Sequence, residues 1–332
     1  MAHEVKLDVY TLHVKRHKKE EYVNFDYFYY DSSVAKKKAT KLEFKKFFSD
    51  YVKSYDNKFW VQEISGKALN LSSKNLKYAT EQRTIYGTIE GGTTGIGSRI
   101  KKVEDVSDET AFQVTKEMVE SIPYYFLIWV PNDSNIGLLI VQGIGNKSVS
   151  DVFRAHLKGF FNKTTSGVSL IINEHIPKAA EKKMKDKGMV NSVMLRRFHL
   201  PSSKAEKILG LQYVPEEINV EVKITGLKNV RGFKQKLRDF FSGKITELID
   251  IEPLSDYGID GKHDVVVTYE HDGKKANGKL SNDFKLAPTY YLEEKDVVRN
   301  ALNHPTFDCI NNYCTSFLEV LKKEIKYKKT KK

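Results

Sequence analysis

The feature that most constrains the fold is a pair of apolar segments joined by a short polar linker. The first segment, FLIWV, ends at Val130, and the second, LLIVQ, begins at Leu138. The linker Pro131–Asn135 is rich in turn-forming residues and too short to contain a crossover helix. The two segments are therefore predicted to form an antiparallel hairpin.

Apolar periodicity predicts further elements around this hairpin. Spacing of two residues predicts strands, and spacing of three to four residues predicts helices. Besides the hairpin, the predicted strands cover residues 6–14, 58–64, 83–90, 168–172, 192–198, 218–224 and 264–269. The predicted helices cover residues 44–55, 148–161, 180–188, 230–241 and 305–327. In the first strand the alternation changes phase after Val9, which indicates a bulge.

These elements predict an α+β protein with mixed, largely antiparallel sheets and packed helices, arranged in two lobes. A length of 332 residues also favours two domains. With a boundary at residues 201–203, we expect an N-terminal α+β domain over 1–200, a C-terminal α+β domain over 204–326 and a basic tail over 327–332. A hinge or long mobile loop is predicted at the glycine-rich segment that contains Gly91, Gly92, Gly95 and Gly97.

The chain carries an excess of basic residues. Lys and Arg number 55 against 43 Asp and Glu, which gives a formal net charge of +12. Part of this charge is clustered, in residues 15–19, 36–38, 180–188 and 322–332. Clustered cations favour a polyanionic partner, most often nucleic acid, that is bound through its phosphates and without sequence preference.

Several other classes of protein are disfavoured. No apolar run approaches the roughly 20 residues that cross a bilayer, and the N-terminus lacks a signal-peptide pattern, so we expect a cytoplasmic protein that does not itself insert into a membrane. The two cysteines and nine histidines have no metal-ligand spacing, so no metal and no cofactor is expected. His156 lies on the apolar face of its predicted helix, where a buried, hydrogen-bonded imidazole is expected.

The turn Gly143–Ser148 joins a predicted strand to a predicted helix. It does not match the P-loop pattern G-x-x-x-x-G-K-[ST], because Asn146 separates the glycine from the lysine. Its glycines, the charge of Lys147 and a helix capped by Ser148 would still suit a phosphate group. The alternative is an ordinary capped turn.

The helix over residues 230–241 is predicted to carry a basic stripe. Its buried face would comprise Val230, Phe233, Leu237, Phe240 and Phe241. Its basic face would comprise Arg231, Lys234 and Arg238, with Lys228 and Lys236 nearby. Such a stripe would contact a nucleic-acid backbone without reading sequence. Further candidate contacts are Lys182, Lys183, Lys185 and Arg196.

Two other patterns leave alternatives open. Glu221 and Lys223 have the E-x-K spacing found in metal-dependent nucleases, although no convincing second carboxylate precedes them. The last helix carries an apolar stripe with the spacing of a short coiled coil, formed by Phe307, Ile310, Cys314, Phe317 and Leu321. This stripe predicts either packing within the chain or a dimer seam.

The order of these elements is similar to that of a known family. The segment FLIWVPNDSNIGLLIVQGIGNKSVSDVF resembles the middle of the lambda Rex exclusion protein A family. INVEVKITGLKNVRGFKQKLRDFF resembles its next unit, and YYLEEKDVV followed by NNYCTSFLEVLKKEI resembles its closing helix. The resemblance extends over about two thirds of the chain and excludes the first hundred residues.

The resemblance implies an α+β homodimer that binds DNA with little sequence preference and acts in phage exclusion or abortive infection. It also implies a membrane-protein partner. The first hypothesis is therefore a non-enzymatic DNA-binding protein of anti-phage defence, with double-stranded DNA favoured over single-stranded DNA. The second is a metal-dependent nuclease or nucleotide-modifying toxin that uses Glu221 and Lys223. The third is a structural protein whose basic surfaces bind an acidic partner.

Overall fold

The computed structural model describes residues 3–25, 41–95, 97–104, 111–165, 167–197, 199–212, 218–257, 259, 263–271, 274–279 and 286–327. The chain forms two compact units. Unit 1 comprises Met1–His175 together with Tyr290–Lys332, and unit 2 comprises Ile176–Thr289. Unit 2 is therefore inserted between two segments of unit 1.

The predicted domain boundary at residues 201–203 is wrong, because it falls inside unit 2. Strand β12 (Met189–Arg197) precedes this point, and strands β13 (Val220–Thr225) and β14 (Asp264–His271) follow it. Since β12 pairs with both β13 and β14, these three strands belong to one sheet. The predicted 327–332 tail lies outside the described residues beyond Tyr327.

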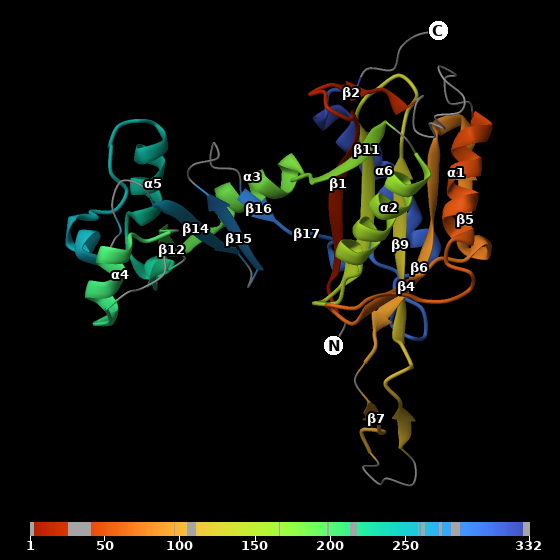
Figure 1. The fold of residues 1–332 in the computed structure, drawn as a ribbon, viewed down its shortest axis with the longest axis horizontal. Helices are drawn as coiled ribbons and strands as arrows, with labels where there is room; N and C mark the ends of the chain where they lie inside the picture. Colours follow the sequence, from red (N-terminus) through yellow and green to blue (C-terminus); the bar gives the residue numbers. More distant parts are fainter. Residues whose placement is uncertain are drawn as a thin grey trace. The chain divides into compact units, whose positions relative to one another are not determined.

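Unit 1 is built on a ten-stranded antiparallel sheet in the described part of the chain (Figure 1). The main strand order is β11-β1-β10-β9-β6-β4-β3; β2 and β17 also pair with β1, and β5 pairs with β6. The strands are β1 (Val5–Arg16), β2 (Tyr22–Val23), β3 (Trp60–Gln62), β4 (Lys67–Asn70), β5 (Leu76–Ala79), β6 (Thr84–Thr93), β9 (Glu120–Trp129), β10 (Gly137–Ile144), β11 (Val168–Glu174) and β17 (Tyr290–Tyr291). As predicted, β9 and β10 form an antiparallel hairpin.

Helices cover both faces of this sheet. The helices α1 (Lys41–Lys53) and α2 (Ser150–Thr164) pack on one face, and α6 (Phe307–Glu324) packs on the other. Successive residues of β9 point to opposite faces of the sheet: Phe126 and Ile128 face α1 and α2, whereas Leu127 and Trp129 face α6. A strand buried on both faces needs a continuous apolar run, which explains the sequence of the hairpin.

The same arrangement explains the change of phase in β1. Val5, Leu7 and Val9 are buried on the α6 side, whereas Tyr10 and Leu12 are buried on the side of α1 and α2. The pairing of β1 with β10 runs without a register shift from Val5 to Leu12. The predicted bulge is therefore wrong; the strand is regular, and different helices cover its two ends.

The first two glycines of the predicted hinge lie inside a paired strand. In β6, Gly91 and Gly92 pair with β4 on one side and with β9 on the other. A Cβ at Gly92 would clash with the backbone carbonyl of Glu120, so this glycine permits a close approach of two strands. Gly95 and Gly97 follow β6, before a two-stranded arm formed by β7 (Ser98–Ile100) and β8 (Phe112–Val114).

The apolar stripe of α6 is used within the chain. Ile310, Cys314, Phe317 and Leu321 are buried against β1, β9 and β10. The stripe therefore contributes to the core of unit 1 and is not exposed as a dimer seam. None of the helices in the described residues is both long and apolar enough to cross a membrane.

Unit 2 contains a five-stranded antiparallel sheet with the order β13-β12-β14-β15-β16 in the described residues. Its remaining elements are α3 (Lys178–Lys187), α4 (Ser202–Leu209), α5 (Phe233–Phe241), β15 (Lys274–Lys279) and β16 (Leu286–Pro288). Short 3₁₀ turns occur in both units, at Ser73–Asn75, Thr80–Gln82, Leu227–Asn229, Glu252–Tyr257 and Glu294–Asp296. The predicted α+β class is thus confirmed in both units.

Candidate functional site

Two helices of unit 2 cover the same face of its sheet. Met184 of α3 and Leu237 of α5 belong to one buried cluster, together with Val193, Val267 and Tyr269 from the strands. In β12 and β14 these residues alternate with residues of the other face, among them Arg196, Thr268 and Glu270, and none of the described helices of unit 2 contributes to a buried cluster on that face. The outer surfaces of α3 and α5 therefore point away from the sheet on the same side of unit 2.

Lys234 joins the two helices. Its Nζ donates hydrogen bonds to the backbone carbonyls of Asp186 and Gly188, both at 2.8 Å, at the C-terminal end of α3. A cation is stabilised there by the negative end of the helix dipole. Burial, and then the neighbouring Arg238 guanidinium, lower the pKa of Lys234. Lys234, predicted as a phosphate contact, is thus a positioning residue that holds α5 beside α3.

Exposed cations gather on the outer surfaces of these two helices. On α3, Lys182 lies opposite the buried Met184, and on α5, Arg238 lies on the same side as Lys234. We call the exposed surface of α3, of α5 and of the residues just before α5 the α3–α5 face; its exposed cations are Lys182, Lys183 and Lys187 of α3, Lys236 and Arg238 of α5, and Arg231, which precedes α5. None of these six forms an ion pair with an acidic residue in the part of the chain that the structure describes. Lys185, also on α3, pairs with Glu181 at 2.8 Å.

The predicted stripe on α5 is shorter than expected. Gly232 has φ 85, in the left-handed region, and the helix begins after it at Phe233. Arg231 therefore precedes the helix and does not share a stripe with Lys234 and Arg238. Val230, predicted as buried, is 52% exposed. The side chain of Phe241 lies outside the described residues.

Arg196, Glu221 and Lys223 lie on the opposite face of the sheet. Arg196 pairs in register with Glu221, and their side chains form an ion pair. The next carboxylate along this face, Asp264, pairs with Lys279 at 2.6 Å. The carboxylates of Glu221 and Asp264, which a nuclease would need as metal ligands, are therefore already paired with basic side chains. Lys228 also points away from the α3–α5 face, with its Nζ 4.0 Å from the Glu270 carboxylate.

The turn Gly143–Ser148 lies in unit 1 and is not built as a backbone cradle for an anion. The amides of Ile144 and Lys147 bond to each other's carbonyls, and the amide of Gly145 donates to Glu4 at 2.7 Å. The Ser148 hydroxyl donates to the Asp8 carboxylate at 2.9 Å, and Lys147 lies 3.3 Å from Glu120. Helix α2 begins two residues later, at Ser150, so Ser148 is not its N-cap.

The structure thus joins the C-terminal end of α3 to α5, which the sequence predicts as separate basic segments, through Lys234. Arg196 and Lys228 lie on the other side of the unit 2 sheet, and Lys147 and Ser148 belong to unit 1. The sequence analysis missed Lys187, although it belongs to the same basic segment as Lys182 and Lys183. No group of three or more His, Cys, Asp or Glu side chains that could hold a metal occurs among the described residues.

Neither protein families nor curated protein sequences provide a match for this chain. The resemblance to the Rex exclusion protein A family therefore stays a prediction.

Proposed function

We propose that this protein binds nucleic acid without sequence preference, through the α3–α5 face. The observation that carries the proposal is that Lys234 places two basic segments about 50 residues apart side by side, each with exposed cations that form no ion pair among the described residues. When unpaired lysine and arginine side chains neutralise phosphates, the counterions condensed on the nucleic acid are released, which favours binding. On the other sheet face, by contrast, Arg196 and Lys279 already have carboxylate partners.

The α3–α5 face favours duplex over single-stranded nucleic acid. Binding of single strands relies on exposed aromatic rings that stack on bases. Phe233 and Phe240, the described aromatic residues of α5, pack against the core of unit 2. Contacts from this face are therefore expected to reach phosphates and not bases.

The test compares the wild type with the double variant Lys182→Glu/Arg238→Glu, which reverses one charge on each helix. Fluorescence anisotropy with a random-sequence DNA duplex, repeated over a series of salt concentrations, gives the affinity and its salt dependence. We expect the variant to bind at least about tenfold more weakly and its salt slope to fall by about two, because two phosphate contacts are lost.

A matched control is Lys53→Glu/Lys158→Glu, which makes the same change in net charge on exposed helical positions of unit 1. It should bind nearly as tightly as the wild type. Equal losses in both double variants would mean that net charge, not the α3–α5 face, determines binding. A salt-independent affinity of the wild type would contradict the proposal altogether.

The resemblance to the Rex family adds the proposal that this binding serves anti-phage defence. Phage plating efficiency on cells that express the wild type, the face variant or the control variant tests it. The wild type and the control variant should reduce plating, and the face variant should not.

A further inference from the structure

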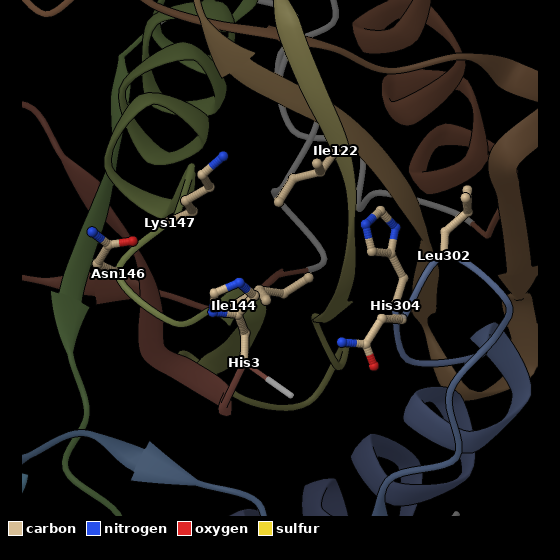
Figure 2. Close-up of a pocket in the computed structure, with 8 residues that line it drawn as sticks. His3, Ile122, Ile144, Asn146, Lys147, Leu302 and His304 are labelled. Atoms are coloured by element: carbon tan, nitrogen blue, oxygen red, sulfur yellow. The ribbon is translucent and has the colours of Figure 1, made fainter. Parts of the chain in front are cut away.

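A cavity of about 340 Å³ lies in unit 1, where three distant segments of the chain meet beside Ile122 of β9 (Figure 2). The turn before α2 contributes Asn146 and Lys147, the loop before α6 contributes His304, and the start of the chain contributes His3. In Figure 2 the turn lies on one side of the cavity and His304 on the other, with His3 below. The volume is within the range of sites for small molecules.

The lining combines basic and apolar groups. Two imidazoles, the Lys147 ammonium and the Asn146 amide supply polar groups, whereas Ile122 and Ile144 supply apolar walls. No acidic residue is among the described residues that line the cavity. The lining is therefore suited to an anion that is attached to a less polar body.

Arg299 holds two of the three segments in place. It forms a bidentate pair with Glu294, with both N···O distances 3.0 Å, and its side chain is 11% exposed. The same guanidinium donates to the backbone carbonyls of His3 at 2.9 Å and Asn303 at 3.1 Å. The third segment is tied to the first by the bond from the Gly145 amide to the Glu4 carbonyl.

The loop that carries His304 is also fixed internally. The side-chain oxygen of Asn300 accepts hydrogen bonds from the amides of Leu302 and His304, both at 3.0 Å. The backbone amide of Asn300 in turn donates to the backbone carbonyl of His304 at 2.8 Å. Since these bonds are made within the protein, the cavity is organised before any ligand binds, which lowers the entropic cost of binding.

We propose that this cavity binds a small phosphorylated molecule of the nucleoside monophosphate class. The phosphate would lie between Lys147, His3 and His304, and the apolar walls would contact the base or the sugar. Both side chains of the Lys147–Glu120 ion pair are exposed, so the pair is weak and a ligand phosphate can replace Glu120 as the partner of Lys147. The site lies in unit 1 and is independent of the nucleic-acid binding proposed for the α3–α5 face.

Isothermal titration calorimetry of the full chain with AMP, adenosine and inorganic phosphate tests the proposal. AMP should bind saturably and at least fivefold more tightly than either adenosine or phosphate, because only AMP uses both the basic and the apolar lining. The proposal is overturned if AMP gives no saturable binding, or if one of the two fragments binds as tightly as AMP.

Variants then locate the site. His304→Gln and Lys147→Gln should each weaken AMP binding at least fivefold, whereas the exposed control positions His17→Gln and Lys158→Gln should leave it unchanged. Circular dichroism verifies the fold of each variant. The Lys182→Glu/Arg238→Glu variant should bind AMP like the wild type; a parallel loss there would assign the AMP to the α3–α5 face and overturn the cavity proposal.

Discussion

At the scale of single residues, the side chain with the most perturbed environment among the histidines is His156. Its Nδ1 lies 2.7 Å from the Tyr55 hydroxyl, which lies 2.8 Å from the Tyr51 hydroxyl. The Trp60 ring packs against the imidazole, with 4.8 Å between the two ring centroids. The expected hydrogen bonding of the imidazole is confirmed, although the side chain is only partly buried, and the network joins the end of α1 to α2. Burial, and then the charge of Lys163, lower the pKa of His156 to about 4.

This shift predicts how stability depends on pH. An unfolded histidine has a pKa of about 6.5. Between pH 6.5 and 4 the unfolded state therefore binds more protons than the folded state, and the stability contributed by neutral His156 is lost as the pH falls. Urea midpoints measured from pH 7.5 to 4.5 should decrease, and they should decrease less in His156→Gln, whose amide does not titrate. His17→Gln should retain the wild-type dependence; identical curves for His156→Gln and wild type would refute the role of His156.

Residue properties that depend on one neighbouring turn could be predicted from the sequence, and those that depend on distant partners could not. The partial burial of His156 follows from its helix face alone. The capture of Lys234 by α3 requires a contact between residues 46 and 48 positions apart. His3 and His304 are still further apart, so no spacing in the sequence could pair them.

At the scale of elements, the junction between α3 and α5 depends on a single cationic side chain. Replacing Lys234 by Met keeps most of the length of the side chain and removes both hydrogen bonds, leaving the last carbonyls of α3 without this donor. We expect the free energy of unfolding to fall by about 1.5–3 kcal/mol, the usual range for hydrogen bonds to a charged group. Urea unfolding measures the loss, and the exposed neighbour Lys236→Met should change it by less than about 0.5 kcal/mol.

The Lys234→Met variant also tests whether Lys234 only positions α5 or directly contacts nucleic-acid phosphates. DNA affinity should fall less in Lys234→Met than in Lys182→Glu/Arg238→Glu, since the Lys234 ammonium is engaged with two carbonyls at the end of α3. A larger loss would assign Lys234 to phosphate binding, as the sequence pattern proposes.

The elements themselves were largely predictable, because their apolar periodicity is local. In α1, for example, Phe44, Phe47, Phe48 and Tyr51 are buried at the spacing of three to four residues that predicts a helix over 44–55. The errors arose where one pattern has two physical explanations. A change of phase occurs at a bulge, but also in a regular strand such as β1 whose two faces are covered by different helices. Glycines occur in hinges, but also, as at Gly92, where strands approach closely.

At the scale of the whole molecule, the division into two units could not be read from the sequence. Unit 1 depends on pairing between β1 and β17 and on packing of α6 against β1, contacts between opposite ends of the chain. Local composition around residues 201–203 resembles a linker, yet β12, β13 and β14 join across it.

The division predicts that unit 2 folds on its own. It has a separate buried cluster and its own sheet, so residues 176–289 expressed alone should unfold cooperatively in urea. If the α3–α5 face binds nucleic acid, this fragment should also retain most of the salt-dependent DNA affinity of the full chain. A fragment with no cooperative transition would show that unit 2 needs unit 1 to fold.

The insertion of unit 2 also sets an order of events during synthesis. The strands β1, β9 and β10 leave the ribosome early, but α6, which covers one of their faces, follows only after all of unit 2. Since the chain is synthesised at about 5–20 residues per second, α6 is completed on the order of ten seconds after the sheet strands. Until then the apolar side chains of Leu7, Leu127 and Ile140 are not covered by α6. During that interval the nascent chain presents a bare hydrophobic sheet face, so its yield in cells should depend on chaperones that bind such surfaces.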